Sequence, residues 1–425
     1  AVDLDALTAY GEAPFTLDQD APVLVSELDR IGDLGTLGPA QQRFLRVVGI
    51  VPPGKVYMLT GSPELGSSTA GTPATADIYE LSSLDDGEPW SFEKIGDLKG
   101  TTNPPARVSA AASSVLVGDT PMILVTGGRE NFWVIGPSHD DWFLWDPATQ
   151  EIADKGRLTE GRSEHFHVPL ANGTVLVAGG WATNEGGGVV TNFADLIDPT
   201  RGTVEEIDLD LPGDSGSNGA SLGADGALVC GGFATSFDLA GTPLATSVSD
   251  CVIVNFQGVS RPAAALPIPL AKFAMAAAGE GKVLVAGGIN WDGTKDANQR
   301  FSAVNQAFLY DAGPDTWTAV SPLNDARSAA VGISLANGRV LVVGGASQDG
   351  VYQLPDGEVG CPEVYTPGNQ RFARLDDQCG SWGAGAAPPV AQWPGLGTVL
   401  LKGYTVQEDP QDAVGFLGAA PAIGQ

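Results

Sequence analysis

Residues 175–180 have the sequence VLVAGG, and close variants of this stretch occur six more times along the chain. The seven copies are VYMLTGS at 56–62, ILVTGG at 123–128, VLVAGG at 175–180, ALVCGG at 227–232, VLVAGG at 283–288, VLVVGG at 340–345 and VLLKGY at 399–404. Each copy is a short apolar run that ends at glycine. Because glycine adopts positive φ at little cost, each copy predicts a buried strand followed by a sharp stop.

These stretches recur at a spacing of about 57 residues, which is the signature of a repeat architecture. Their first glycines are Gly61, Gly127, Gly179, Gly231, Gly287, Gly344 and Gly403. Turn sequences precede several copies, at Asn172-Gly173, Asp225-Gly226 and Asn337-Gly338, and predict two-residue hairpins to an earlier strand.

A third strand follows each glycine pair after a long loop of variable sequence, and it ends in a turn such as LWDPATQ at 144–150. A large residue there stands seven positions before the next apolar one, which predicts a third and a fourth strand around a tight turn. The pairs are Trp145 and Ile152, Ile197 and Val204, Tyr310 and Trp317, and Tyr365 and Phe372.

Each unit is therefore expected to be a four-stranded antiparallel sheet of about 50 residues. One such sheet cannot bury both of its faces, whereas radial stacking around an axis buries them and leaves only short edges. Seven units predict an all-β fold, a seven-bladed β-propeller.

Residues near 24–34 are expected to close the ring as the outer strand of the last blade, because the last unit ends one strand short. Ile31-Gly32-Asp33-Leu34 matches Ile95-Gly96-Asp97-Leu98, and an Arg follows nine residues after each Leu, at Arg43 and Arg107. We therefore expect a lead segment at 1–21 and a single propeller domain at 22–425.

The pattern resembles the Kelch repeat, as in the propeller domain of galactose oxidase-like proteins. It has an Arg at the start of the inner strand, a turn glycine, the VLVxGG strand, a Tyr-Asp-Pro-like turn and then Trp. The fourth unit departs most, because it lacks the Tyr-Asp-Pro and carries Cys230 and Cys251. The resemblance implies the fold, but Kelch propellers include oxidases, epimerases and pure binding modules, so it does not imply one function.

The charge of the chain limits the classes of molecule that it is expected to bind. There are 22 basic and 51 acidic residues, a net charge of −29. This composition argues against nucleic acid and against anionic lipid, both of which need a basic surface. No apolar run reaches the ~18 residues of a membrane span, so no direct membrane insertion is expected.

Four cysteines favour an exported protein that is extracellular, at the cell surface or periplasmic. Cys230 with Cys251 and Cys361 with Cys379 can each close a local bridge, while free buried thiols are the alternative. The opening AVDLDALTAYG lacks the regions of a signal peptide, which fits either a processed export signal or a trimmed sequence.

The chain has three histidines. His165 and His167 are two apart on a predicted inner strand and should point to one face. Together with His139 they are weak candidates for a Zn²⁺ or Cu²⁺ site. The alternative is that the pair lines the channel or makes hydrogen bonds within it. No cofactor is expected, although the acidic loop at 291–296 could hold Ca²⁺.

Two sets of residues point to a ligand face. By family resemblance, bases at the starts of inner strands ring the channel mouth, and aromatics in the loops after the glycine pairs share that face. The bases are Arg43, Arg107, Arg162, Lys272 and Arg327, and the aromatics are Phe132, Trp133, Trp181, Phe233, Trp291 and Tyr404. The alternative for the bases is pairing with the backbone or with acids of the next blade.

The leading functional hypothesis is a non-catalytic exported propeller that binds a protein, peptide or carbohydrate at this loop face. A carbohydrate-active enzyme of oxidase, epimerase or hydrolase type using the same face is the second hypothesis. A structural subunit of a surface assembly is the third. A galactose oxidase-like copper site is disfavoured, because two disulfides would leave no Cys for the Tyr–Cys cross-link of that family.

Overall fold

The computed structural model describes most of the chain from residue 46 onward. The described residues are 46–52, 55–62, 74–81, 92–131, 137–184, 187–189, 192–212, 215–237, 243–292, 303–335, 338–345, 361–375, 390–393, 397–401 and 414–418.

Within these residues the strands form nine antiparallel sheets, and we number the seven larger ones as blades 1–7 in chain order. Blade 1 consists of β1 (Val47–Val51), β2 (Lys55–Leu59), β3 (Asp77–Leu81) and β4 (Phe92–Asp97). Blade 2 consists of β5 (Ala111–Val117), β6 (Thr120–Thr126), β7 (Asp141–Asp146) and β8 (Glu151–Arg157). Blade 3 consists of β9 (Phe166–Pro169), β10 (Val175–Ala178), β13 (Phe193–Asp198) and β14 (Thr203–Asp208).

Blades 4 to 7 continue the same order. Blade 4 consists of β15 (Asn218–Ser221), β16 (Ala227–Cys230), β19 (Cys251–Val254) and β20 (Ser260–Ala263), and blade 5 of β21 (Ala274–Ala277), β22 (Lys282–Ala286), β23 (Ala307–Asp311) and β24 (Thr316–Ala319). Blade 6 consists of β25 (Val331–Ser334), β26 (Val340–Val343), β27 (Glu363–Thr366) and β28 (Arg371–Arg374). Blade 7 consists of β29 (Val390–Trp393), β30 (Gly397–Leu401) and β31 (Val414–Gly418). Blades 3 and 4 also carry hairpins after their glycine pairs, made of β11 (Ala182–Asn184) with β12 (Gly187–Val189) and β17 (Phe233–Phe237) with β18 (Pro243–Ser247). A short 3-10 helix, η2 (Gly223–Asp225), joins β15 to β16.

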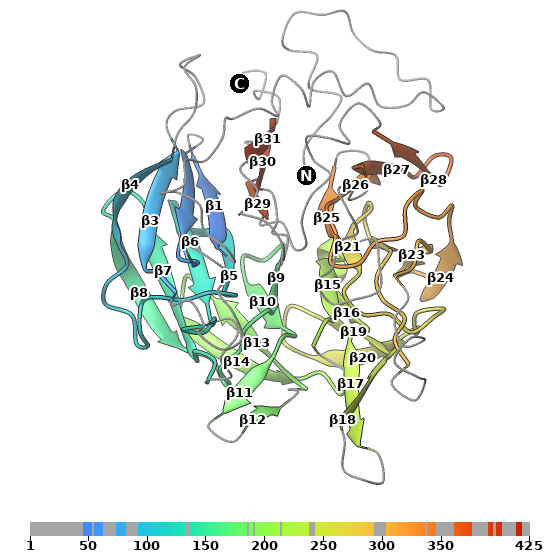
Figure 1. Ribbon diagram of the computed structural model, residues 1–425, viewed down its shortest axis with the longest axis horizontal. Helices are drawn as coiled ribbons and strands as arrows, with labels where there is room; N and C mark the ends of the chain where they lie inside the picture. The colour runs from blue at the N-terminus through green and yellow to red at the C-terminus, as the bar shows by residue number, and fades with distance from the viewer. Residues whose placement is uncertain are drawn as a thin grey trace, which may run out of the picture.

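The seven sheets follow one another in chain order around a common centre (Figure 1). Each of β1, β9, β15 and β21 lies beside the inner strand of the next blade in the chain, and β29 of blade 7 lies beside β1 of blade 1. This arrangement fits the predicted seven-bladed propeller. The strand predicted to close the ring, near 24–34, lies outside the described residues, as does Arg43, and closure by that strand stays a prediction.

The apolar core lies in layers between neighbouring blades, which we call seams. The seam between blades 1 and 2 joins Tyr57 and Leu59 to Val125 and Trp145. The seams that follow pair blade 2 with 3, 3 with 4, 4 with 5 and 5 with 6 in the same way. Val390 of blade 7 packs against the cluster of blade 6. Each sheet therefore buries both faces only through its neighbours, as the repeat predicts.

The seven-residue spacing marks the outer hairpin of blades 2, 3, 5 and 6, as predicted. Trp145 pairs across the strands with Ile152, Ile197 with Val204, Tyr310 with Trp317, and Tyr365 with Phe372. Two of these pairs also bring aromatic rings together, with centroids 5.0 Å apart for Tyr310 and Trp317 and 5.4 Å apart for Tyr365 and Phe372.

The glycine pair has a structural reason in the contact between blades. Gly128 donates its N–H to the carbonyl of Arg162 in blade 3 at 2.8 Å. A Cβ built on Gly127, whose φ is +56°, would overlap that same carbonyl oxygen. Gly232 and Gly288 donate in the same way to the next blades, at 2.9 Å and 2.7 Å. The first glycine thus makes room for a carbonyl that the second glycine binds.

Blade 1 differs in one detail from the predicted alignment. Gly61 donates its N–H to the carbonyl of Arg107 at 2.9 Å, so it takes the place of a second glycine. Thr60 takes the first place, with a φ of 62°. The identification of Gly61 as a first glycine was therefore wrong by one position, because the apolar run of blade 1 ends in Thr-Gly rather than Gly-Gly.

A chain of hydrogen bonds also links the starts of the inner strands, and we call it the girdle. Its residues have left-handed φ: Ser109, Glu164, Gly216, Lys272 and Ala329. Glu164 donates its N–H to Ser109 at 2.9 Å, Lys272 to Gly216 at 2.7 Å, and Ala329 to Lys272 at 2.7 Å. The positive φ turns each backbone toward the preceding blade and ties neighbouring blades together.

One predicted disulfide is confirmed. Cys230 on β16 is directly opposite Cys251 on β19, with Cα atoms 4.1 Å apart, and the two sulfurs are bonded. Cys361 is also disulfide-bonded. Its predicted partner, Cys379, lies outside the described residues, so that pairing stays a prediction. In the described part of the chain, no helix has the length and apolar character needed to cross a membrane.

A Gly127→Ala variant tests the close approach between blades. Gly118, in the β5–β6 turn, also has positive φ (61°), but a Cβ there would meet nothing within 4 Å. We expect Gly118→Ala to cost about 1–2 kcal/mol for the left-handed backbone, and Gly127→Ala to cost about 1–3 kcal/mol more for the overlap. Denaturant unfolding measures both. Equal losses for the two variants would contradict the proposed role of the first glycine.

Blade 5 supplies a matched test of the disulfide. Its paired residues Ala286 and Ala307 occupy the places that Cys230 and Cys251 occupy in blade 4. A Cys230→Ala, Cys251→Ala variant should therefore keep the packing and lose only the cross-link. For a loop of about 20 residues, we expect the free energy of unfolding to fall by roughly 3 kcal/mol. An unchanged denaturant midpoint would refute this contribution.

Candidate functional site

The inner strands begin next to the loops that follow the glycine pairs. Isolated bridges join these starts to the loops after the glycine pairs: Val108 to Arg129, Ser163 to Trp181, Ser215 to Phe233, and Ala271 to Ile289. The two sets of candidate residues therefore do lie along one edge of the blades, which we call the mouth face.

The arginines at these starts do not present their charges to solvent. Arg107, Arg162 and Arg327 are buried, with relative exposures of 0%, 0% and 1%. Arg107 Nη1 donates to Asp141 Oδ1 at 2.9 Å, Arg162 Nη2 to Asp195 Oδ2 at 3.1 Å, and Arg327 Nη2 to Glu363 Oε1 at 2.8 Å. Each acid stands on the third strand of the same blade as its arginine. The sequence had suggested acids of the next blade as the alternative to ligand binding.

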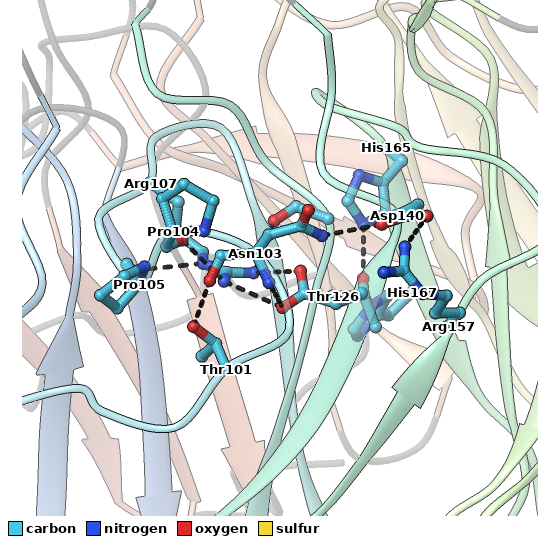
Figure 2. Close-up of polar contacts among 12 residues, drawn as sticks. Thr101, Asn103, Pro104, Pro105, Arg107, Thr126, Asp140, Arg157, His165 and His167 are labelled. Atoms are coloured by element: carbon cyan, nitrogen blue, oxygen red, sulfur yellow. Dashed lines mark hydrogen bonds and ion pairs between the residues drawn. The ribbon is translucent and has the colours of Figure 1, made fainter.

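Each guanidinium also donates a hydrogen bond to the carbonyl of the first glycine in the pair of its own blade. Nη1 of Arg107 donates to the carbonyl of Gly127 at 3.0 Å, and Arg162 and Arg327 reach Gly179 and Gly344 in the same way, both at 3.4 Å. In blade 2, Arg107 also donates to the carbonyls of Pro104 and Pro105 (Figure 2). These arginines are buried and paired with acids inside the blades, so their assignment as ligand-binding residues at the mouth is corrected.

The paired acid also holds the linker that enters the blade. The N–H of Asn103 donates to Asp141 at 3.3 Å, that of Thr159 to Asp195 at 2.9 Å, and that of Asn324 to Glu363 at 2.8 Å. Burial of Asp141 opposes its ionisation, but the charge and hydrogen bonds of Arg107, together with those of Asn103, outweigh burial and lower the pKa of Asp141.

Lys272 was predicted to stand in the same place as these arginines, and the structure corrects this by two residues. The carbonyl of Leu270 accepts the N–H of Gly232, as that of Arg162 accepts the N–H of Gly128, so Leu270 occupies the arginine position. The matching acid position in blade 5 is Gln306, whose carbonyl accepts from Gly287 as that of Asp141 accepts from Gly127. Lys272 itself belongs to the girdle and is half-buried.

Three predicted aromatics lie on successive blades at the mouth face. Trp181 is 37% exposed, one of few large apolar side chains this accessible among the described residues. Phe233 and Trp291 are half-buried and form an edge-to-face pair with ring centroids 6.1 Å apart. Trp291 is anchored by its backbone N–H, which donates to Ser247 Oγ at 2.9 Å. Phe132, Trp133 and Tyr404 lie outside the described residues.

An ion pair at the mouth face was not predicted. Arg129, which follows the glycine pair of blade 2, donates from Nη2 to Glu164 Oε1 of blade 3 at 2.5 Å. The Arg129 side chain is 13% exposed and that of Glu164 is 27% exposed. The two positions belong to unrelated parts of the repeat, so only the juxtaposition of two blades reveals the pair.

His165 and His167 point to one face, as predicted, but that face is the seam between blades 2 and 3. Thr126 Oγ1 on β6 lies 2.5 Å from His165 Nε2 and 2.7 Å from His167 Nε2 (Figure 2). Ser113 Oγ on β5 lies 3.0 Å from His167 Nδ1. We call these four residues the imidazole cluster.

Both rings of the cluster are held in the neutral form. Burial, then the charges of His167 and Arg162, lower the pKa of His165 well below its usual value. Burial, then the charge of Arg162, lowers the pKa of His167 to about 3.

His139 is not part of this cluster. It is buried on the loop before β7, and its pKa is lowered by burial and by the charge of Arg107. Among the described residues, no group of three His, Cys, Asp or Glu side chains is placed to hold a metal ion. The His-x-His pair thus gains no third ligand within that part of the chain. Most of the acidic loop considered for Ca²⁺, 293–296, lies outside it.

Comparisons with known proteins give no family. No family model and no curated protein matches the chain. Among solved structures, the chain is similar to YjhT with a TM-score of 0.49 and 15% sequence identity, over 78% of this chain and 97% of YjhT. Similarity at this level does not identify the fold, which is assigned from the sheets and seams described above.

Blade 5 again supplies a test, here of the buried ion pairs. Arg107→Leu leaves the Asp141 carboxylate buried without its partner, which we expect to cost about 3–5 kcal/mol. Adding Asp141→Gln recreates the Leu270 and Gln306 combination of blade 5 and should recover much of that loss. A double-mutant cycle by denaturant unfolding measures the recovery. A double variant less stable than Arg107→Leu alone would contradict this account.

Proposed function

We propose that this protein is an exported, non-catalytic propeller of the Kelch type that binds a ligand, with a carbohydrate favoured, through its mouth face. The observation that carries the proposal is the exposed indole of Trp181 at the mouth, next to loops that differ from blade to blade on a repeated scaffold. A rigid scaffold with variable loops is a common way to build recognition.

The residues that vary are those at the mouth. The position after the second glycine is Arg129 in blade 2, Trp181 in blade 3, Phe233 in blade 4 and Ile289 in blade 5, whereas the strands below repeat. Blades 3 and 4 extend this position into the hairpins β11–β12 and β17–β18. Neighbouring blades therefore offer different chemistry on one face, which suits a ligand that spans several of them.

The placement of the arginines changes the expected ligand class. A cationic mouth would have favoured an anion, but three of its predicted charges are neutralised inside the blades. The described residues of this face include an exposed indole, an aromatic pair, the ion pair of Arg129 and Glu164, and the half-buried Lys272. An aromatic face with nearby hydrogen-bonding groups suits a sugar ring, which is apolar on its C–H faces and polar at its hydroxyls.

Export is supported by the disulfide between Cys230 and Cys251, since such bridges persist in oxidising compartments. The strongly acidic composition favours neutral or polar ligands over nucleic acid.

A Trp181→Ala variant tests the mouth face. If Trp181 anchors the ligand, its removal should weaken binding by about 1 kcal/mol or more, roughly fivefold in Kd. Fold stability should change little because the indole is partly solvated. A glycan and peptide array, followed by calorimetry on the best binder, measures the loss.

Val259→Ala is the matched control, because Val259 is also exposed (58%) but lies on the turn between β19 and β20. Equal effects of the two variants would contradict the assignment. Selection of peptides alone would replace carbohydrate by peptide as the ligand, and chemical change of a bound glycan would replace the binding function by an enzymatic one.

A further inference from the structure

The imidazole cluster is unusual for its place in the repeat. Thr126 is the residue before the glycine pair in blade 2, and the other described blades have apolar residues or the disulfide there: Leu59, Ala178, Cys230, Ala286 and Val343. His165 follows the girdle residue of blade 3, and other blades have Ala110, Ser217, Phe273 or Ala330 at that place. One seam therefore carries a polar network, buried at Thr126 and His165 and half-buried at His167 and Ser113, where comparable positions are mostly apolar.

Packing alone does not require the imidazoles. A Cβ built on Gly127 would lie 2.8 Å from Cε1 of His165, and one built on Gly231 would lie 2.8 Å from Cε1 of Phe273. The two rings thus cover the first glycine of the preceding blade in the same way. A benzene ring satisfies the shape in blade 5, so what the imidazole adds is its ability to hydrogen-bond and to take up a proton.

All three hydrogen bonds of the cluster can form while both imidazole rings are neutral. We assign His165 Nε2–H as donor to Thr126, the Thr126 hydroxyl as donor to His167 Nε2, and His167 Nδ1–H as donor to Ser113. His165 Nδ1 is buried and has no partner. With the donors assigned in this way, His165 Nδ1 carries a lone pair. With the opposite assignment it would carry a buried N–H without an acceptor, which is rarer in proteins.

An added proton has no favourable place in this network. On His165 Nδ1 it would create a buried cation with no acceptor, and on His167 it would displace the hydroxyl proton of Thr126. The nearby charged groups do not compensate: Arg162, on the same blade, is cationic and already pairs with Asp195. β5 and β6 contribute only the hydroxyls of Ser113 and Thr126, and no carboxylate in the described residues bonds to either ring.

The cluster also adjoins the mouth face. Glu164 directly precedes His165 and pairs across the same seam with Arg129, while its N–H is bonded to Ser109 in the girdle. Loosening the seam at His165 would therefore strain the bonds that join blades 2 and 3 at the mouth.

We propose that the imidazole cluster makes the seam between blades 2 and 3 acid-sensitive, so that protonation separates the two blades at the mouth and alters the ligand face. At neutral pH the three hydrogen bonds of the cluster add to the apolar packing and the backbone bonds that close the seam. Below about pH 6.5, where free imidazole is charged, the opened state binds protons that the closed state excludes, so acid favours opening. The seam between blades 4 and 5, with Phe273 and Met275, has no such response.

Hydrogen exchange read by mass spectrometry tests this, with rates corrected for the intrinsic effect of pH. Peptides that cover 122–131 and 162–170 report the seam between blades 2 and 3, and peptides that cover 227–232 and 270–277 report the seam between blades 4 and 5. Between about pH 7.5 and about pH 4.5 we expect corrected exchange to rise roughly tenfold in the first seam and to change little in the second.

The variants take their residues from blade 5. Thr126→Ala, His165→Phe and His167→Met together install the side chains of Ala286, Phe273 and Met275, and should abolish the acid response while folding normally at neutral pH. The single variant His165→Phe, which changes less, should reduce the response. His139→Phe is the control for the third histidine and should leave the response intact.

Two outcomes would overturn the proposal: exchange in the first seam of the wild type that does not depend on pH, or an acid response of unchanged size in the triple or the single variant. Neither outcome depends on which ligand the mouth binds, so a failure here is distinct from a failure of the proposed function.

Discussion

The carbonyl of Arg162 accepts the N–H of Gly128, at a point where any side chain on Gly127 would overlap it. This contact between blades sets how closely two sheets approach, and the same contact joins blade 1 to 2, 4 to 5 and 5 to 6. Because each sheet is apolar on both faces, its strands are stable only when neighbours cover them. The two left-handed residues, Gly-Gly in most blades and Thr60-Gly61 in blade 1, are therefore the constraint on which the seams, the girdle and the mouth depend.

The buried ion pairs support that contact from within each blade. Where the arginine is present at the start of the inner strand, an acid stands on the third strand, as in Arg107 with Asp141; where Leu270 replaces it, Gln306 replaces the acid. Blade 4 differs, because Asp250 occupies the acid position, with its carbonyl accepting the N–H of Gly231, while Asp214 rather than an arginine stands two residues before Gly216. The buried ion pair is therefore a feature of blades 2, 3 and 6 among the described residues. Its energetic role follows from burial, since one charge left without the other would be far less stable than two uncharged residues.

Against this regular scaffold, polarity is concentrated at one place. Blades 2 and 3 bring together the imidazole cluster, the ion pair of Arg129 and Glu164, and the exposed Trp181. At the corresponding depth the seam between blades 4 and 5 has Asn218, whose side-chain amide donates to the carbonyl of Phe273 at 3.0 Å, but no imidazole. The repeat supplies equivalent positions that can be compared within one molecule, and these comparisons show which polar groups the fold itself does not need.

The sequence by itself determined the seven units, their antiparallel strands, the register of the outer hairpins and the bridge between Cys230 and Cys251. These features depend on local periodicity, turn chemistry and near-neighbour spacing, all of which are visible along the chain. The role of the arginines was decided only by tertiary structure, because Arg107 and Asp141 are 34 residues apart and a basic residue at a strand start has the same appearance whether it faces solvent or a buried acid. The same holds for His165, His167 and Thr126, which meet across a seam between two blades. Sequence distance hides such contacts, and stacking the blades creates them.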